Sequence, residues 1–210
     1  MEFGVDEAGK GPVLGSMFAA AIRAPKAELP EGIDDSKRLS ARRREAIADR
    51  LRESPRVEIG IAEITPARID AGNMNDLTVS AHASAAEIVV QPGDSGLCDA
   101  GDVDAGRFGT RVESRIETFV SVDAMHRADE SDPLVGAASI IAKSEREAHV
   151  DSLCEQFGEV GSGYPSDSTT RTFLSRYFRD HGEFPPPTRL SWSTCGAIRS
   201  AVEQTELGDH

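Results

Sequence analysis

Apolar positions near the N-terminus follow strand-like patterns. Apolar runs at residues 3–6 and 13–22 flank the break Gly9-Lys10-Gly11-Pro12, and two such runs joined by a glycine- and proline-containing turn predict a β-hairpin. Three later runs predict further strands, at residues 57–62, 96–98 and 118–122. The strands therefore lie mainly in the first 125 residues.

Two stretches in the first half have the residue types and spacing of capped helices. Residues 41–53 contain helix formers, an apolar pair four residues apart and Ser40 at the N-cap position. A second helix is expected to begin after a capping Asn75 or Asp76. Its apolar face is expected to consist of Leu77, Ala81, Ala85 and Ile88.

The second half of the chain is predicted to be mainly helical. Pro133, at the first helical position behind the capping residue Asp132, opens a long helix that extends to about Phe157. Two further helices are expected at about 169–181 and 193–204. The pattern predicts an α/β fold: a mixed sheet flanked by helices, with a helical C-terminal appendage. We expect a core of residues 1–160 and a C-terminal segment of residues 161–210 packed on it in one folding unit.

Acidic residues dominate the charge balance. The 210 residues include 36 Asp and Glu against 23 Lys and Arg, for a formal net charge of −13. Only four of the basic residues are lysines: Lys10, Lys26, Lys37 and Lys143. Acid excess with arginine in place of lysine resembles proteins of salt-loving organisms. On charge alone a nucleic-acid partner is disfavoured, unless a local site overrides the global charge.

Cysteine usage and hydropathy indicate the compartment. Cys98, Cys154 and Cys195 are far apart and lack metal-binding spacing, which favours a reduced cytoplasm over a disulfide scaffold. No apolar run approaches the roughly 20 residues of a membrane span. The N-terminus has no basic region of the kind that opens a secretion signal. The sequence therefore predicts a cytoplasmic protein with no membrane partner.

The segment Asp6-Glu7-Ala8-Gly9-Lys10-Gly11 is the most informative for chemistry. In a continuous strand Asp6 and Glu7 would point to opposite faces, but the glycines behind them allow a turn that brings both to one centre. Paired acids of this kind bind hard cations such as Mg²⁺. An acidic turn without chemistry remains the alternative. A phosphate-binding P-loop is disfavoured, because Gly11 replaces the Ser or Thr of that motif and the two acids would repel phosphate.

Further acids and lysines lie at similar positions. Asp99 follows a short apolar run, and Asp129 precedes the helix opened by Pro133. Because strands in one sheet bring their ends together, these acids are candidates for the same centre. Ser139 and Lys143 are four residues apart on one helix face and suit a phosphate, although a solvated helix surface is the simpler interpretation.

Several separated motifs together resemble the ribonuclease HII family of the archaeal kind. The motifs are Asp6-Glu7-Ala8-Gly9-Lys10-Gly11-Pro12, Asp35-Ser36-Lys37-Arg38-Leu39, Cys98-Asp99-Ala100, Ala128-Asp129, residues 137–143 and Gly161-Ser162-Gly163-Tyr164-Pro165-Ser166-Asp167. The resemblance implies a ribonuclease H-like core and metal-dependent cleavage of RNA in RNA–DNA hybrids and at ribonucleotides embedded in duplex DNA. It also implies a nick on the 5′ side of the ribonucleotide, leaving 3′-hydroxyl and 5′-phosphate ends.

The same resemblance assigns roles to individual residues. Its four catalytic carboxylates, which also hold the metals, fall on Asp6, Glu7, Asp99 and Asp129. Its substrate-binding glycine loop falls on Gly9, Lys10 and Gly11, and its junction-sensing tyrosine falls on Tyr164. Lys10 stands where the family usually has arginine, and lysine cannot donate a bidentate pair of hydrogen bonds. Lys37 belongs to a further substrate-binding motif.

Hydrolysis of a phosphodiester fits two divalent ions, Mg²⁺ or Mn²⁺. We expect Asp6 to bridge both ions, with Glu7 and Asp99 on one and Asp129 on the other. Ser139 and Lys143 are expected to position substrate phosphates. Discrimination of RNA requires polar contacts to the 2′-hydroxyl, which we expect from the main chain of the glycine loop and from Tyr164.

Two other functions remain open at this point. A ribonuclease H-like DNA nuclease that ignores the sugar would share the metal site, and an inert hybrid-binding module would share the fold. Four intact acids argue against the inert module. We expect a monomer, with a sliding clamp as a candidate protein partner.

Overall fold

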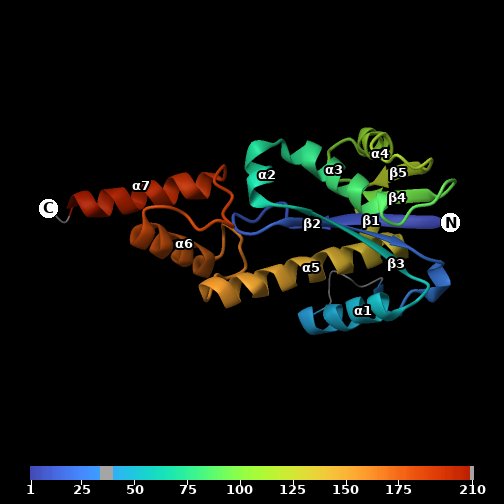
Figure 1. The fold of residues 1–210 in the computed structure, drawn as a ribbon, viewed down its shortest axis with the longest axis horizontal. Helices are drawn as coiled ribbons and strands as arrows, with labels where there is room; N and C mark the ends of the chain where they lie inside the picture. Colours follow the sequence, from blue (N-terminus) through green and yellow to red (C-terminus); the bar gives the residue numbers. More distant parts are fainter. Residues whose placement is uncertain (34–39, 209–210) are drawn as a thin grey trace.

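A five-stranded mixed sheet lies at the centre of the computed structural model, which describes residues 1–33 and 40–208 (Figure 1). The strands are β1 (Glu2–Ala8), β2 (Met17–Arg23), β3 (Glu58–Ile64), β4 (Ser95–Asp99) and β5 (Ser121–Met125). Their order is β3-β2-β1-β4-β5, with β1, β2 and β3 paired antiparallel and β4 and β5 parallel to β1. The predicted hairpin and mixed sheet are confirmed. Because β1, β4 and β5 run in the same direction, their carboxyl ends meet at one edge.

Helices cover both faces of this sheet. On one face lie α1 (Ala41–Glu53) and α5 (Pro133–Phe157), and on the other α2 (Pro66–Ala71), α3 (Met74–Glu87) and α4 (Ala105–Glu113). Beyond the end of the sheet lie α6 (Ser168–His181) and α7 (Ser193–Gly208) (Figure 1). Two short 3₁₀ helices in the described ranges are η1 (Lys26–Glu28) and η3 (Ala128–Glu130). No helix in the described ranges is long and apolar enough to cross a bilayer.

The pleat of β1 divides its side chains between two hydrophobic clusters. Phe3 and Val5 pack with α3 and α4, whereas Ala8 packs with α1 and α5. Gly4 faces α5 so closely that an added Cβ would lie 2.4 Å from the main chain of Leu134. Odd-numbered and even-numbered residues of β1 therefore face opposite layers, which determines where the acids at its end point.

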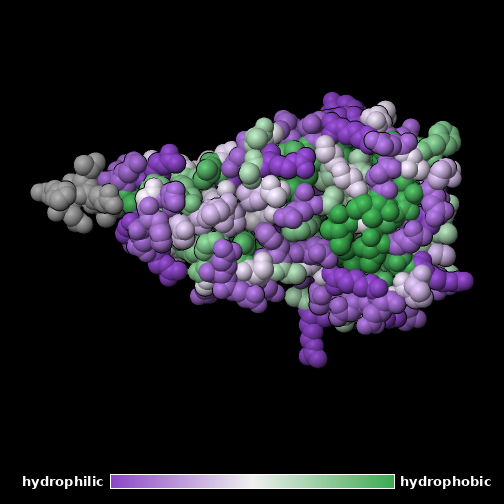
Figure 2. Space-filling view, in the orientation of Figure 1, coloured by the Kyte–Doolittle hydropathy of each residue, from purple (hydrophilic) through white to green (hydrophobic). Residues whose placement is uncertain are grey.

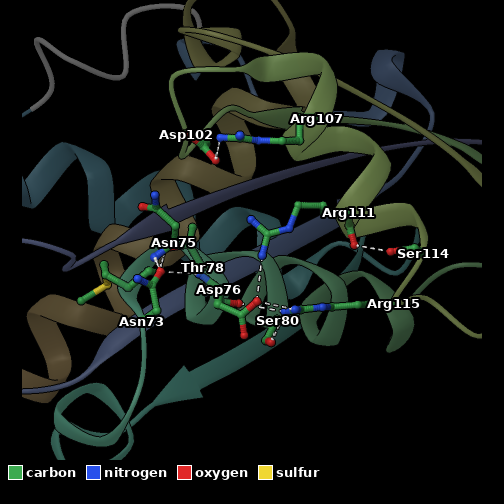
Figure 3. Close-up of polar contacts among 11 residues, drawn as sticks. Asn73, Asn75, Asp76, Thr78, Ser80, Asp102, Arg107, Arg111, Ser114 and Arg115 are labelled. Carbon is green, nitrogen blue, oxygen red and sulfur yellow. Dashed lines mark hydrogen bonds and ion pairs between the residues drawn. The ribbon is translucent and has the colours of Figure 1, made fainter.

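The predicted caps are partly confirmed. Ser40 accepts a hydrogen bond from Arg43 N at the start of α1, and Asp132 accepts from Leu134 N at the start of α5. The expectation of Asn75 or Asp76 as the cap of α3 is wrong, because Asn73 accepts from both of their N–H groups (Figure 3).

An ion-pair network joins α3 to α4. Asp76 accepts hydrogen bonds from Arg111 at 2.7 Å and from Arg115 at 2.5 Å, and Arg115 also donates to Ser80 (Figure 3). Arg115 in particular lowers the pKa of Asp76. Asp76 is therefore an inter-helix contact rather than a cap.

Other boundaries and faces differ from the sequence prediction. Ile88 is 62% exposed, because α3 ends at Glu87 and Ile88 lies outside its last turn, beside Gly60 of β3. β5 begins at Ser121, and the preceding residues 118–120 form a loop. Neither α2, which has only six residues, nor α4 was predicted, although the buried Phe108 and Val112 of α4 have the four-residue spacing of one helix face. The face shown in Figure 2 is mainly hydrophilic, apart from an apolar patch over the region of β3.

The C-terminal helices pack against the turn that follows β1. Val13 and Leu14 belong to the same buried cluster as Phe173 and Leu174 of α6. The N–H groups of Val13 and Leu14 both donate to the Gly163 carbonyl. The division at residue 160 stays a prediction, but the two parts share one apolar cluster.

A buried ion pair closes the other end of the sheet. Asp94, only 3% exposed, accepts hydrogen bonds from Arg23 Nε at 2.6 Å and from Gln91 N at 2.8 Å. Burial alone would raise the pKa of Asp94, but the hydrogen bonds from Arg23 and from the amino group of Met1 lower it to about 2. This end lies away from the carboxyl ends of the parallel strands.

We predict that Asp94→Asn lowers the free energy of unfolding by about 2 kcal/mol at neutral pH, because it removes the buried partner of Arg23 and leaves only the half-exposed Glu58 to pair with that cation. The folded pKa lies below the unfolded value of about 3.9, so the contribution of Asp94 is complete above that pH and disappears as the pH falls toward 2. Denaturant titration of both proteins across this range measures the effect. Asp49→Asn, which loses only an exposed pair with Arg52, should cost less than about 1 kcal/mol.

Candidate active site

Three aspartates converge at the carboxyl edge of the parallel strands. Asp6 lies near the end of β1, Asp99 is the last residue of β4, and Asp129 lies in η3 just after β5. Each offers a carboxylate oxygen, and these oxygens all lie within 4.8 Å of one another. Asp6 and Asp129 are buried and Asp99 is partly exposed, while Asp99 Oδ1 accepts from Ala128 N at 3.2 Å. That bond fixes η3 against β4 and places Asp129 beside the other two.

Burial and mutual repulsion control the protonation of this cluster. Burial, together with the nearby charges of Glu7 and Asp99, raises the pKa of Asp6 to about 7. Burial also raises the pKa of Asp99, and the charge of Asp129 adds to the effect. Carboxylates held together in this way are stabilised by a cation between them. A set of oxygen donors fits a hard divalent ion such as Mg²⁺ or Mn²⁺.

Glu7 faces the other side of the sheet. The expected turn directly behind it does not occur, because β1 continues to Ala8 and the pleat sends Asp6 toward α5 and Glu7 toward α3. Glu7 Oε2 lies 2.7 Å from His82 Nε2, and Glu7 Oε1 lies 3.6 Å from Lys10 Nζ. Although burial acts in the opposite direction, His82 and Lys10 together lower the pKa of Glu7. Glu7 is not a member of the three-aspartate cluster, although its charge acts on it.

His82 is a functional candidate that sequence reasoning missed. It is fully buried on α3, and its ring packs edge-on against Phe108 with centroids 5.1 Å apart. Its only sequence signal is an isolated histidine among the alanines of a helix, and 75 residues separate it from Glu7. Only the packing of α3 on β1 brings the two together.

Ser139 and Lys143 form a chain of contacts that ends at Asp6. Lys143 Nζ donates to Ser139 Oγ at 2.8 Å, and a hydrogen bond from Ser139 lowers the pKa of Asp6 against the larger opposing effect of burial. Ser139 is completely buried. The hydroxyl is enclosed between Lys143 and Asp6, and the expected contact of Ser139 with a substrate phosphate stays a prediction.

The glycine loop follows directly from β1, and Tyr164 lies beside it. Gly9 has a φ of +95°, a conformation that favours glycine. Gly11 lies against Tyr164: a Cβ atom added to Gly11 would be 3.5 Å from the tyrosine ring. Lys10 Nζ donates to the Gly101 carbonyl at 2.7 Å. Lys37, also predicted to bind substrate, lies outside the described residues.

An open cleft of about 420 Å³ adjoins the site on the Glu7 side. Glu7 and Lys10 form one wall, and Asn75, Asp102 and His126 are among the residues that form the others. The cleft is open to solvent beside Glu7, and Asp6, Asp99 and Asp129 do not line it.

Comparison with solved structures defines the class of protein. The crystal structure of ribonuclease H2 from Pyrococcus horikoshii superposes with a TM-score of 0.88 at 32% identity, covering 96% of this chain and 98% of that one. A ribonuclease HII from Archaeoglobus fulgidus, solved in complex with PCNA, gives a TM-score of 0.82 at 34% identity over 95% and 97%. The fold and its acidic edge therefore define a ribonuclease H-like enzyme.

Sequence comparison narrows this class to one family. The model of the family described as Ribonuclease HII matches residues 3–195. The ribonuclease HII of the halophilic archaeon Natronomonas pharaonis is 63% identical over 204 residues, which are 97% of this chain and 96% of that one. The chain belongs to the ribonuclease HII family and is a ribonuclease H hydrolase. The resemblance stated from the motifs is thereby confirmed, as is the fold that it implied.

We predict a pH-dependent stability in the metal-free protein. The pKa of folded Asp6 is about 7 against about 3.9 in the unfolded chain, so Asp6 favours folding fully below pH 4 and loses this contribution as the pH rises through 7. Mg²⁺ or Mn²⁺ should therefore raise the thermal midpoint more at pH 8 than at pH 6. Asp6→Asn should flatten both dependences. Identical pH profiles for the two proteins without metal would contradict the assignment.

Proposed function

We propose that this protein is a metal-dependent endoribonuclease that hydrolyses the RNA strand of RNA–DNA hybrids. We further propose that it cuts on the 5′ side of ribonucleotides embedded in duplex DNA, leaving 3′-hydroxyl and 5′-phosphate ends. The observation that carries this proposal is the convergence of Asp6, Asp99 and Asp129 at the end of β1, the strand that leads directly into the glycine loop, together with Tyr164 beside Gly11 of that loop. One strand and the turn after it thus connect a candidate cation site to a candidate sugar-binding surface.

The acidic cluster is the proposed metal site. Asp6, Asp99 and Asp129 would hold the divalent cations, and the negative charge of Glu7, which acts on Asp6 from the α3 side, would add to their attraction. When bound, a pair of such ions neutralises charge on the phosphate, activates the attacking water and stabilises the leaving oxygen. Lys10 and His82 orient Glu7, and the ammonium group of Lys10 offsets its charge.

Ser139 and Lys143 belong to one hydrogen-bond chain that runs from Lys143 through Ser139 to Asp6. Ser139 orients the Asp6 carboxylate, and Lys143 holds Ser139 with one of its three N–H donors. Since Lys143 is partly exposed, its remaining donors are available to a backbone phosphate. This contact would position the substrate without reading its sequence.

Recognition of the ribonucleotide belongs to the glycine loop and Tyr164. Gly11 is exposed and has no side chain, which lets a sugar approach the main chain there, and Tyr164 is exposed beside Gly11 to stack on it. The 2′-hydroxyl is both a donor and an acceptor and distinguishes RNA from DNA at this point. Lys10 is directed to the Gly101 carbonyl and toward Glu7, so the loop presents main chain rather than a guanidinium.

A sliding clamp is the proposed protein partner. The Archaeoglobus fulgidus relative was solved in complex with PCNA. In this chain the far end of α7 projects beyond the rest of the molecule, away from the sheet and its acidic edge (Figure 1). A contact there would leave the active site open to a duplex.

Two matched duplexes test the proposed activity, one all-DNA and one with a single ribonucleotide. With Mg²⁺ we expect one cut on the 5′ side of the ribonucleotide and none in the all-DNA duplex, and a chelator should abolish cleavage. Asp6→Asn should lower turnover by more than about 100-fold, since it removes a ligand charge, while Asp49→Asn should leave it unchanged. Equal cleavage of both duplexes would indicate a nuclease that ignores the sugar.

Salt dependence tests the role of the acidic surface. A net charge of −13 repels a polyanion at long range, and molar KCl screens that repulsion even as it weakens phosphate contacts. We therefore expect cleavage to persist in molar KCl, measured as initial rates on the ribonucleotide duplex. The Pyrococcus horikoshii relative, assayed alongside, provides the comparison. Loss of activity above physiological salt would contradict adaptation to high salt.

A further inference from the structure

The three carbonyl groups of the glycine loop are all held by the C-terminal segment. Arg189 Nη2 donates to the Gly9 carbonyl at 2.6 Å, and Nη1 donates to the Lys10 carbonyl at 2.8 Å. Trp192 Nε1 donates to the Gly11 carbonyl at 3.1 Å. Two side chains from one short turn therefore bind three consecutive carbonyls about 180 residues earlier in the chain.

Arg189 is unusually placed for an arginine. It is completely buried, and its third hydrogen bond, from Nε, also goes to a main-chain carbonyl, that of Gly15 at 2.9 Å. The face of the guanidinium lies 5.1 Å from the centre of the Trp192 ring. Burying a cation against carbonyls rather than a carboxylate costs free energy, so the arrangement calls for a function that a smaller apolar residue would not supply.

The hydrogen bonds to these carbonyls determine where the loop's N–H groups point. No cis peptide bond occurs in the described ranges, and in a planar trans peptide the C=O and the next N–H are directed oppositely. With the Gly9 and Lys10 carbonyls turned toward Arg189, the N–H groups of Lys10 and Gly11 are directed away from it. Gly11 is exposed at this point and lies beside Tyr164.

The turn that carries Arg189 and Trp192 is itself firmly anchored. Asp70, at the end of α2, accepts hydrogen bonds from Leu190 N at 2.8 Å and from Ser191 N at 2.9 Å. On the other side Arg189 N donates to the Val13 carbonyl. The turn that carries Arg189 and Trp192 is therefore held by α2 on one side and by Val13 on the other, and these two side chains are not free to follow the loop.

We propose that Arg189 and Trp192 are positioning residues that fix the Gly9–Gly11 main chain for ribonucleotide recognition. Neither residue touches the substrate; both act through the loop. The inference rests on the proposed function, in which this loop contacts the 2′-hydroxyl. It makes the C-terminal segment a determinant of discrimination between RNA and DNA, in addition to its contribution of Tyr164.

The decisive variant is Trp192→Phe, which removes the donor to the Gly11 carbonyl and keeps an aromatic ring beside Arg189. Arg189→Lys keeps the charge and removes the guanidinium fork. Asp94→Asn is the matched control, since it destabilises the sheet at the end away from the loop. All are made in the full-length Asp6→Asn protein, and fluorescence anisotropy gives dissociation constants for the one-ribonucleotide and all-DNA duplexes.

We expect Trp192→Phe to reduce the preference for the ribonucleotide duplex about 5- to 10-fold, the value of one lost hydrogen bond. Arg189→Lys should reduce it further, and Asp94→Asn should leave it unchanged. Amide hydrogen exchange in the peptide that spans the loop should accelerate in Trp192→Phe and Arg189→Lys but not in Asp94→Asn. If Arg189→Lys fails to fold, Trp192→Phe decides the question.

Two results would overturn the inference. One is an unchanged preference in Trp192→Phe. The other is amide exchange in the loop that accelerates in Asp94→Asn as much as in the Trp192 and Arg189 variants, because exchange would then report global stability alone. A parent protein that binds both duplexes equally would instead refute the proposed recognition of the sugar, and with it this inference. The failures are therefore distinguishable.

Discussion

Repulsion among buried carboxylates is the constraint on which the site depends. Asp6, Asp99 and Asp129 come from three separate elements, yet their oxygens lie within 4.8 Å of one another at the edge where parallel strands end. Such a cluster opposes folding unless protons or cations neutralise it, and the pKa of Asp6, raised by burial and by its acidic neighbours, reflects that cost. The surrounding contacts, from Ser139 on one side and Ala128 N on the other, hold the carboxylates in place against this repulsion.

The sheet separates two kinds of electrostatic support for the site. On the α5 side, Lys143 and Ser139 lead to Asp6. On the α3 side, His82 and Lys10 hold Glu7. The adjacent acids Asp6 and Glu7 thus receive their contacts from helices on opposite faces of the sheet, because the pleat of β1 directs their side chains to opposite faces. Two of the chain's four lysines, Lys10 and Lys143, thus lie beside Glu7 and Ser139 at the acidic edge.

The C-terminal segment is joined to the candidate active site by direct contacts. It carries Tyr164, which lies beside Gly11, and Arg189 and Trp192 donate hydrogen bonds to the three carbonyls of the glycine loop. Val13 and Leu14, which follow that loop, are buried in the same cluster as α6. The segment that the sequence presents as an appendage is therefore continuous with the catalytic edge through shared packing and hydrogen bonds.

The sequence by itself determined the features that depend on neighbouring residues. Apolar alternation and capping residues predicted the hairpin, α1 and α5, and the acids at 6, 7, 99 and 129 could be chosen because motifs place them at strand and helix ends. The six-residue helix α2 is too short to show a periodic pattern, whereas the apolar face of α4 at Phe108 and Val112 could have been found from the sequence. Asn73 is one of several polar residues that could have capped α3. Only the tertiary structure decided that Glu7 turns from Asp6 toward His82, and that Arg189 reaches Gly9. These contacts join residues 75 and 180 positions apart, and local sequence carries no information about which distant side chain packing will bring near.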